Sequence, residues 1–172
     1  MRHSFWWSWE FVERLLRVIQ TVGVAVAGFS LLLASHQLKL ARLSESATLG
    51  LQFDTRINTG VNFEISGAIE DDAKLLKKHD GKFTEAQLDD YLGQYDALYY
   101  LYAQGLVNEQ MIFALFSYDI GLAYKNHEVQ EYVREVQAKD ASLFVGFNKL
   151  AQTIETWKSA GRVKRLIEGF VD

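Results

Sequence analysis

The apolar and polar positions divide the chain into an uncharged run near the N-terminus and a series of amphipathic segments after it. Val18–Ser35 contains eighteen residues without a charged side chain. As a helix rising about 1.5 Å per residue, this run covers roughly 27 Å of a hydrocarbon layer that is roughly 30 Å thick. We therefore predict a transmembrane helix over residues 18–35. A buried core helix of a soluble protein is the alternative, but such a helix seldom lacks a polar face for this length.

Aromatic and basic side chains flank the uncharged run. Those before it are Trp6, Trp7, Trp9, Arg14 and Arg17, and those after it are Lys39 and Arg42. Indole rings favour the headgroup region of a bilayer, and long basic side chains reach back to water from it. These residues are therefore predicted to anchor the span at the membrane interfaces, with residues 1–17 as an interfacial segment. The basic residues on the two sides nearly balance, so they barely decide the orientation.

Small and uncharged polar residues form a regular seam within and beyond the span. They alternate at spacings of three and four, at Gln20, Gly23, Ala27, Ser30, Ala34, Gln37 and Ala41. In lipid, helices associate through close backbone approach and side-chain hydrogen bonds, and small residues permit both. The seam predicts a packing face for another transmembrane helix, in a homo-oligomer or a larger complex. Chance is the alternative, because such residues are common in spans.

The helical pattern continues beyond the span to about residue 57. We predict a helical stalk over residues 36–57, with its apolar side at Leu40, Leu43, Ala47 and Leu51. The sequence Asn58-Thr59-Gly60 predicts a break. The stalk should therefore lead directly into the domain that follows.

Residues 58–160 are predicted to form a bundle of four or five helices. The first is expected from Val61 to about Lys78. Thr84 and Gln87 have the spacing of a capping box, which opens a helix that ends at Gly105.

Three further helices complete the predicted bundle. Asn108 should cap one, a second should run from about His127 to Ala138, and Asp140 should cap the last. The whole chain is thus predicted to be all-α, with a single transmembrane helix continuing into this bundle.

Composition and charge exclude several classes of function for the domain, among them thiol chemistry and nucleic-acid binding. The chain has no proline, which suits long helices, and no cysteine, which leaves no disulfide, thiolate metal site or thiol nucleophile. Residues 1–44 sum to +3 and residues 45–172 sum to −7. An acidic domain is a poor match for the phosphates of nucleic acid, so no nucleic-acid partner is predicted.

No set of side chains forms a recognisable catalytic or metal motif. Asp96 and Asp119 lie on or beside apolar stripes, where we expect a structural ion pair of one of them with Arg56. His127 and Glu131 are four residues apart, but a lone pair of this kind is usually a solvated face. The chain is therefore predicted to be non-catalytic and to hold no metal.

His36 carries the one cofactor alternative. It lies at the end of the predicted span, and the small residues before it leave room for a ring. A haem or chlorophyll-type macrocycle ligated by His36 is thus the alternative to an interfacial polar residue with no cofactor.

The last residues, 161–172, read as a basic amphipathic tail. Val163, Leu166, Ile167 and Phe170 share helical spacing, with basic residues clustered around them. Such a segment lies on an anionic bilayer or docks its apolar side on the bundle.

Three stretches carry a resemblance to a known group of proteins. They are LGLQFDTRIN after the span, YLGQYDALYYLYAQGLVNEQMIFALF, and the late FVGFNKLAQTI. The region from about Thr48 to Trp157 resembles a family of uncharacterised bacterial one-pass membrane proteins with a small helical domain of unknown function. The resemblance implies this architecture, and no catalytic residues.

These observations together predict a membrane-anchored accessory or interaction subunit. Its partners would be membrane lipid and another transmembrane protein or a second copy, in the bacterial inner membrane with the bundle cytoplasmic. The alternative function is a membrane-anchored sensor or regulatory module. A pigment- or haem-associated subunit is a further alternative.

Overall fold

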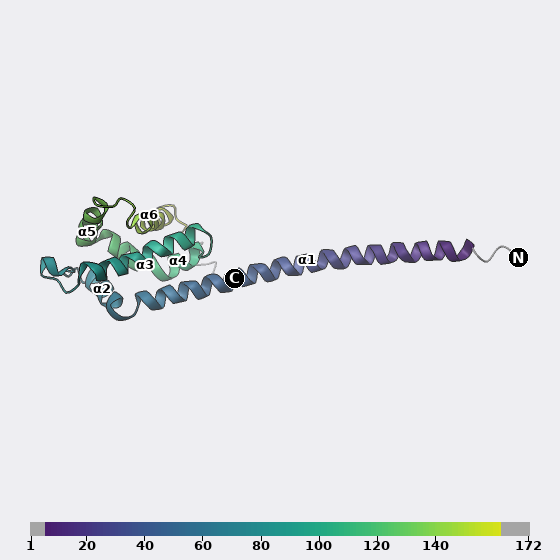
Figure 1. Cartoon of the computed structure of the whole chain (residues 1–172), viewed down its shortest axis with the longest axis horizontal. Coiled ribbons are helices and arrows are strands. Elements are labelled where there is room, and N and C mark those ends of the chain that lie inside the picture. The colour runs from purple at the N-terminus through teal and green to yellow at the C-terminus, as the bar shows by residue number, and fades with distance from the viewer. Residues whose placement is uncertain (1–5, 163–172) are drawn as a thin grey trace. The chain divides into compact units, whose positions relative to one another are not determined.

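Helices account for all the regular secondary structure of the described chain. The computed structural model describes the backbone of residues 6–162, and the side chains of residues 30–162 except 32 and 42. Over this range the chain forms six α-helices, one 3₁₀ turn and no strand (Figure 1). They are α1 (Trp6–Ile57), α2 (Gly60–Glu70), the 3₁₀ turn η1 (Lys77–His79), α3 (Glu85–Ala103), α4 (Glu109–Lys125), α5 (His127–Gln137) and α6 (Val145–Ser159). The predicted all-α class and helical bundle are confirmed.

The chain divides into two compact units between Leu43 and Ser44. The first unit contains the N-terminal part of α1, and the second contains the rest of α1 with α2–α6. The final turns of the predicted stalk, residues 44–57, therefore belong to the bundle. The predicted break is confirmed, because α1 ends at Ile57 and α2 begins at Gly60, whose φ of +58° is easily adopted only without a side chain.

The helix predicted from Val61 to about Lys78 is too long. It ends at Glu70, and Asp72 has a left-handed φ of 51°. Residues 75–83 then fold as a compact loop, in which Phe83 donates to the carbonyl of Leu75 at 2.7 Å and Lys77 to that of Phe83 at 2.8 Å. The adjacent Leu75 and Leu76 are both buried, which an amphipathic surface helix would not achieve.

Local capping fixes the starts of α3, α4 and α5. Thr84 and Gln87 form the predicted capping box, and Asn108 accepts from the backbone N–H of Met111 at 2.8 Å as predicted. Asn126 caps α5 by accepting from Val129 at 3.1 Å. Each cap satisfies an N–H group that the helix itself leaves unpaired.

Asp140 does not cap the last helix, contrary to the prediction. Its Oδ1 accepts hydrogen bonds from the backbone N–H and hydroxyl of Ser142, at 2.9 and 2.7 Å, and so closes a local turn. The helix α6 begins only at Val145. Its first turn is capped from another helix, because Asp96 of α3 accepts from the N–H of Phe147 at 3.1 Å.

The core lies where α6 packs against α3 and α4, while α2 contacts the same two helices and α5 packs on α4. Its largest fully buried side chains are Tyr91, Tyr95, Phe116, Phe147, Ile57, Ile65, Leu75, Leu76, Leu88, Leu92, Leu98 and Ile112. The α1 segment joins this core through Ile57, with Leu49 and Phe53 packed against it. Leu51, predicted on the apolar side of the stalk, is 57% exposed.

Candidate interaction surface

The seam residues with described side chains are all exposed. They are Ser30, Ala34, Gln37 and Ala41, whereas the side chains of Gln20, Gly23 and Ala27 lie outside the described residues. Five leucines on the same stretch of α1 are exposed as well: Leu31, Leu33, Leu38, Leu40 and Leu43. An exposed set of this kind on one helix segment is typical of a surface that another molecule covers.

The side chains of most predicted membrane anchors lie outside the described residues. These anchors are Trp6, Trp7, Trp9, Arg14, Arg17 and Arg42, whereas the side chain of Lys39 is described and is exposed. The side chains of residues 18–29 and 32 of the predicted span also lie outside the described range. No helix has the length and apolarity needed to cross a membrane within the described residues.

The described histidines belong to no metal-binding group. His36 is exposed on α1. Among the described residues, no group of three or more His, Cys, Asp and Glu side chains is arranged to hold a metal ion.

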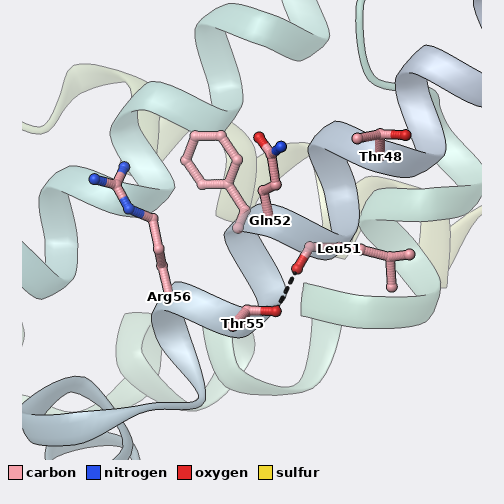
Figure 2. A pocket seen from close by; sticks show the side chains of 6 residues that line it. Thr48, Leu51, Gln52, Thr55 and Arg56 are labelled. Atoms are coloured by element: carbon pink, nitrogen blue, oxygen red, sulfur yellow. Dashed lines mark hydrogen bonds between the residues drawn. The ribbon is translucent and has the colours of Figure 1, made fainter.

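Within the bundle unit, α1 carries a hollow of about 520 Å³ on its outer side. We call it the α1 groove; among the described residues, its lining consists of Thr48, Leu51, Gln52, Phe53, Thr55 and Arg56. Figure 2 shows the side chains of Gln52 and Arg56 extending from the same side of the helix. Thr55 is turned to the backbone, since its hydroxyl donates to the carbonyl of Leu51 at 2.8 Å. Among the lining side chains, Leu51 is apolar and exposed, whereas the half-buried Phe53 packs against the core.

The charges along the α1 groove are separated. Arg56 lies at one end of the groove, is exposed, and makes no ion pair with another residue in the described part of the chain. Glu45 precedes the other end and shares the helical face of Gln52, because the two are seven residues apart. The groove therefore has an acidic group before it and a basic group at its far end, with Leu51 between them.

Asp119 is held by a chain of hydroxyl groups instead of by Arg56. Ser66 of α2 donates to its Oδ1 at 3.2 Å, and the hydroxyl of Ser66 lies 3.4 Å from that of Tyr91. Tyr95 in turn donates to Tyr91 at 3.2 Å, deep in the core. Arg56 does not contact this group, so the predicted ion pair is wrong for Asp119, and Asp96 accepts from Phe147 instead.

Burial raises the pKa of Asp119 above its ordinary value. The hydrogen bond from Ser66 opposes this shift, while the neighbouring carboxylates of Glu70 and Asp54 raise the pKa further. Burial likewise raises the pKa of Tyr91 and of Tyr95. The two tyrosine hydroxyls therefore stay protonated, and the chain of hydrogen bonds joins α2, α3 and α4.

Glu128 of α5 holds the loop between α2 and α3 against α5 through hydrogen bonds. Its carboxylate accepts from the backbone N–H groups of Leu75 at 2.7 Å and Leu76 at 2.9 Å, and lies 2.8 Å from Nδ1 of His79. Burial raises the pKa of Glu128, but these three hydrogen bonds together outweigh it and hold the pKa below its ordinary value. The role of Glu128 is not visible in the sequence, because the residues it binds lie about fifty positions away.

Comparisons with protein-family models, with curated proteins and with solved structures found no match to the chain. The predicted resemblance to bacterial one-pass membrane proteins of unknown function therefore stays a prediction.

Proposed function

We propose that the chain is a non-catalytic, membrane-anchored interaction subunit. Its span would be residues 18–35, and its seam would pack against a transmembrane helix of another protein or of a second copy. The bundle would lie in the bacterial cytoplasm and carry the α1 groove. The observation that carries the proposal is the set of exposed leucines on α1 that lie in the last part of the uncharged run and directly after it.

The exposure of these leucines supports a surface that is covered in the cell. Leu31 is 72% exposed and Leu38 is 64% exposed. Leaving large aliphatic side chains in water costs about 25 cal/mol per Å² of apolar surface relative to burying them. Lipid or a packed helix would remove this cost.

The polar groups of the bundle support a structural role for that domain. The carboxylates that sequence analysis singled out for their position, Asp96 and Asp119, bind a helix N-terminus and a serine hydroxyl. Glu128 binds two backbone N–H groups. These contacts are the kind that satisfy buried polar groups in a stable fold.

Membrane insertion is tested by fractionation of cells that express the full chain. We expect the protein to remain in the membrane pellet after an alkaline wash. A variant with Val24→Lys and Val26→Lys should move to the supernatant, because each central charge costs about 2.5–3.5 kcal/mol on insertion. The matched control, Gln52→Lys in the bundle unit, should stay in the pellet. Recovery of the unaltered chain in the supernatant would refute the proposal.

Packing through the seam is tested by mass measurement in mild detergent. Gly23→Leu with Ala27→Leu should dissociate an assembly, because the added side chains prevent close helix approach. Val22→Leu with Val26→Leu enlarges two positions off the seam and should leave the mass unchanged. An unaltered chain that is monomeric and free of partners would contradict this part of the proposal.

A further inference from the structure

We propose that the thioether sulfur of Met111 is an oxidation site, and that its conversion to the sulfoxide loosens residues 46–53 of α1 from α4. The oxidant class is a two-electron oxygen donor such as hydrogen peroxide. The inference concerns contacts within the bundle unit and does not rest on the proposed membrane span.

Met111 carries the only sulfur atom among the described residues. The chain has no cysteine and two methionines, and the other is Met1, which lies outside that range. Cysteine and methionine are the side chains that mild oxidants attack first. Met111 is partly exposed, so its side chain is in contact with solvent. A mild oxidant that reaches the bundle unit therefore has one preferred target there.

The side chain of Met111 lies against the backbone of α1 at Gly50. A Cβ atom at Gly50 would be 2.6 Å from Cγ of Met111 and 2.8 Å from its sulfur. Both distances are too short for a van der Waals contact, so the thioether occupies space that a side chain at residue 50 would fill. Gly50 itself is buried. The sulfur is therefore packed against α1, although part of Met111 is exposed.

The hydrogen bonds of one capping residue position Met111 at this contact. Asn108 accepts from the backbone N–H of Met111 at 2.8 Å, and its own backbone N–H donates to the hydroxyl oxygen of Ser46 at 3.3 Å. Ser46 and Gly50 are both buried, and they lie on the same side of α1 because they are four residues apart. The start of α4 thus meets α1 at two successive helical turns, through Asn108 and Met111.

Apart from Ile57 at its end, this part of α1 is packed lightly on the bundle. Leu49 and Phe53 are only half-buried against the core. Within the described residues, the extensively packed helix pairs join α6 to α3 and α4 and do not include α1. Opening a lightly packed segment needs less free energy than unfolding the whole domain. A change at Met111 should therefore affect residues 46–53 of α1 before it affects the core.

Oxidation replaces an apolar group in this contact with a polar one. A lone pair of the sulfur attacks one oxygen atom of hydrogen peroxide, so that an S–O bond forms and the O–O bond breaks. A proton passes from the transferred oxygen to the departing one, which leaves as water. The sulfur loses two electrons and the peroxide gains them.

The sulfoxide does not suit the position of the thioether. It is polar and accepts hydrogen bonds, whereas the thioether lies in close contact with the Gly50 backbone. The oxidised side chain should therefore turn toward solvent and leave Gly50, Leu49 and Phe53 less covered. Thiol-dependent reductases return methionine sulfoxide to methionine, so the change is reversible.

Peroxide treatment of the full chain, purified in mild detergent, tests the proposal when it is followed by hydrogen exchange. Peptide mass spectrometry should find one added oxygen on Met111, and it distinguishes this site from Met1. Amide exchange in residues 46–53 should become at least about tenfold faster, because a polar group in an apolar contact favours the open state. Exchange in α6 should stay unchanged, and a methionine sulfoxide reductase should restore slow exchange in residues 46–53.

Met111→Leu is the matched control. Leucine has about the volume of methionine and no oxidisable sulfur, so peroxide should leave the exchange of residues 46–53 in this variant unchanged. Faster exchange after peroxide in Met111→Leu would trace the effect to another group and overturn the proposal. The comparison of oxidised with reductase-treated protein tests the same point in the unaltered chain, without any substitution.

The remaining outcomes are decided in the unaltered chain. If Met111 resists peroxide at concentrations that oxidise it in the denatured chain, it is not an oxidation site. If Met111 is oxidised and the exchange of residues 46–53 stays the same, the sulfur does not hold α1. If exchange accelerates equally in α6, oxidation unfolds the domain as a whole and the local release is wrong.

Discussion

A Cβ atom at Gly146 of α6 would lie 2.8 Å from the backbone carbonyl oxygen of Asp96 on α3 and 2.9 Å from its Oδ1. That Oδ1 accepts the hydrogen bond from Phe147 that caps α6. The missing side chain at residue 146 therefore lets α6 begin in direct contact with α3. This contact sets the position of the two helices that pack most extensively in the bundle.

Gly146→Ala should lower the free energy of unfolding by about 1–3 kcal/mol, the usual cost of overpacking a close contact. The obstacle is a backbone oxygen and a capping carboxylate, and neither can move without loss of a hydrogen bond. Denaturant unfolding of the full chain in detergent measures the effect.

Gly93→Ala on α3 is the matched control. A Cβ there meets no atom within 4 Å, so the variant should gain up to about 1 kcal/mol from helix propensity. Equal responses of the two variants would refute a close approach at Gly146.

Glu128→Gln should destabilise the fold by about 1–3 kcal/mol, because it replaces charge-assisted hydrogen bonds to Leu75 and Leu76 with weaker ones. Because the pKa of Glu128 is lowered in the folded state, its contribution is present above the ordinary pKa of a glutamate. It is lost as the pH falls through the lowered value. The difference in unfolding free energy between the unaltered chain and the variant should therefore shrink in acid.

Glu131→Gln on the same helix provides the comparison for Glu128. Glu131 forms no side-chain hydrogen bond or ion pair in the described part of the chain, so its variant should shift the unfolding midpoint little at any pH. If Glu131→Gln lowered the unfolding free energy as much as Glu128→Gln does, the hydrogen bonds of Glu128 to Leu75 and Leu76 would not explain the effect.

Local sequence was enough to predict the helix starts and the first break. Thr84 and Gln87 lie three residues apart, and Asn108 caps a residue three positions on, so the interacting groups are visible in a short window. The end of α1 before Gly60 follows from the same kind of local signal.

Contacts between distant residues could not be predicted in this way. Asp96 and Phe147 are 51 positions apart, and Glu128 and Leu75 are 53 apart. Asp140 shows that a local turn can compete with a helix cap. Aspartate is a residue type common at helix N-termini, but Asp140 closes a turn with Ser142 instead. The α1 groove was missed because the helical spacing of Leu51 with Leu40, Leu43 and Ala47 predicted an apolar side, whereas the helix packs through Ser46, Gly50 and Ile57.

Asp119→Asn should leave the fold at least as stable at neutral pH. The variant removes a partly buried charge beside Glu70 and Asp54, and the amide oxygen can still accept from Ser66. A raised folded-state pKa means that the native state binds more protons than the unfolded state between the ordinary and the raised value. The contribution of Asp119 to stability therefore falls as the pH rises through this window.

The pH dependence of the difference between the two proteins measures this effect. The advantage of Asp119→Asn in unfolding free energy should grow as the pH rises from the ordinary pKa of an aspartate through the raised value. The control variant is Asp71→Asn, at the exposed end of α2. If the advantage of Asp119→Asn in unfolding free energy grew as the pH fell, the pKa of Asp119 would be lowered in the folded state and not raised.

Phe144 combines a buried ring with a left-handed backbone, at φ 54° and ψ 22°. Loss of the ring should cost about 3–5 kcal/mol in any small replacement, which exceeds the roughly 1–2 kcal/mol of backbone strain. Both Phe144→Ala and Phe144→Gly should therefore be destabilised.

The two variants should differ in the reverse of the usual order. Phe144→Gly should be more stable than Phe144→Ala by about 1 kcal/mol, because only Gly adopts this φ without strain. At Leu143, whose φ is not positive, Ala should be the more stable replacement. Unfolding of the four variants separates the cost of the lost ring from the strain, and an Ala variant more stable than Gly at both positions would contradict strain at Phe144.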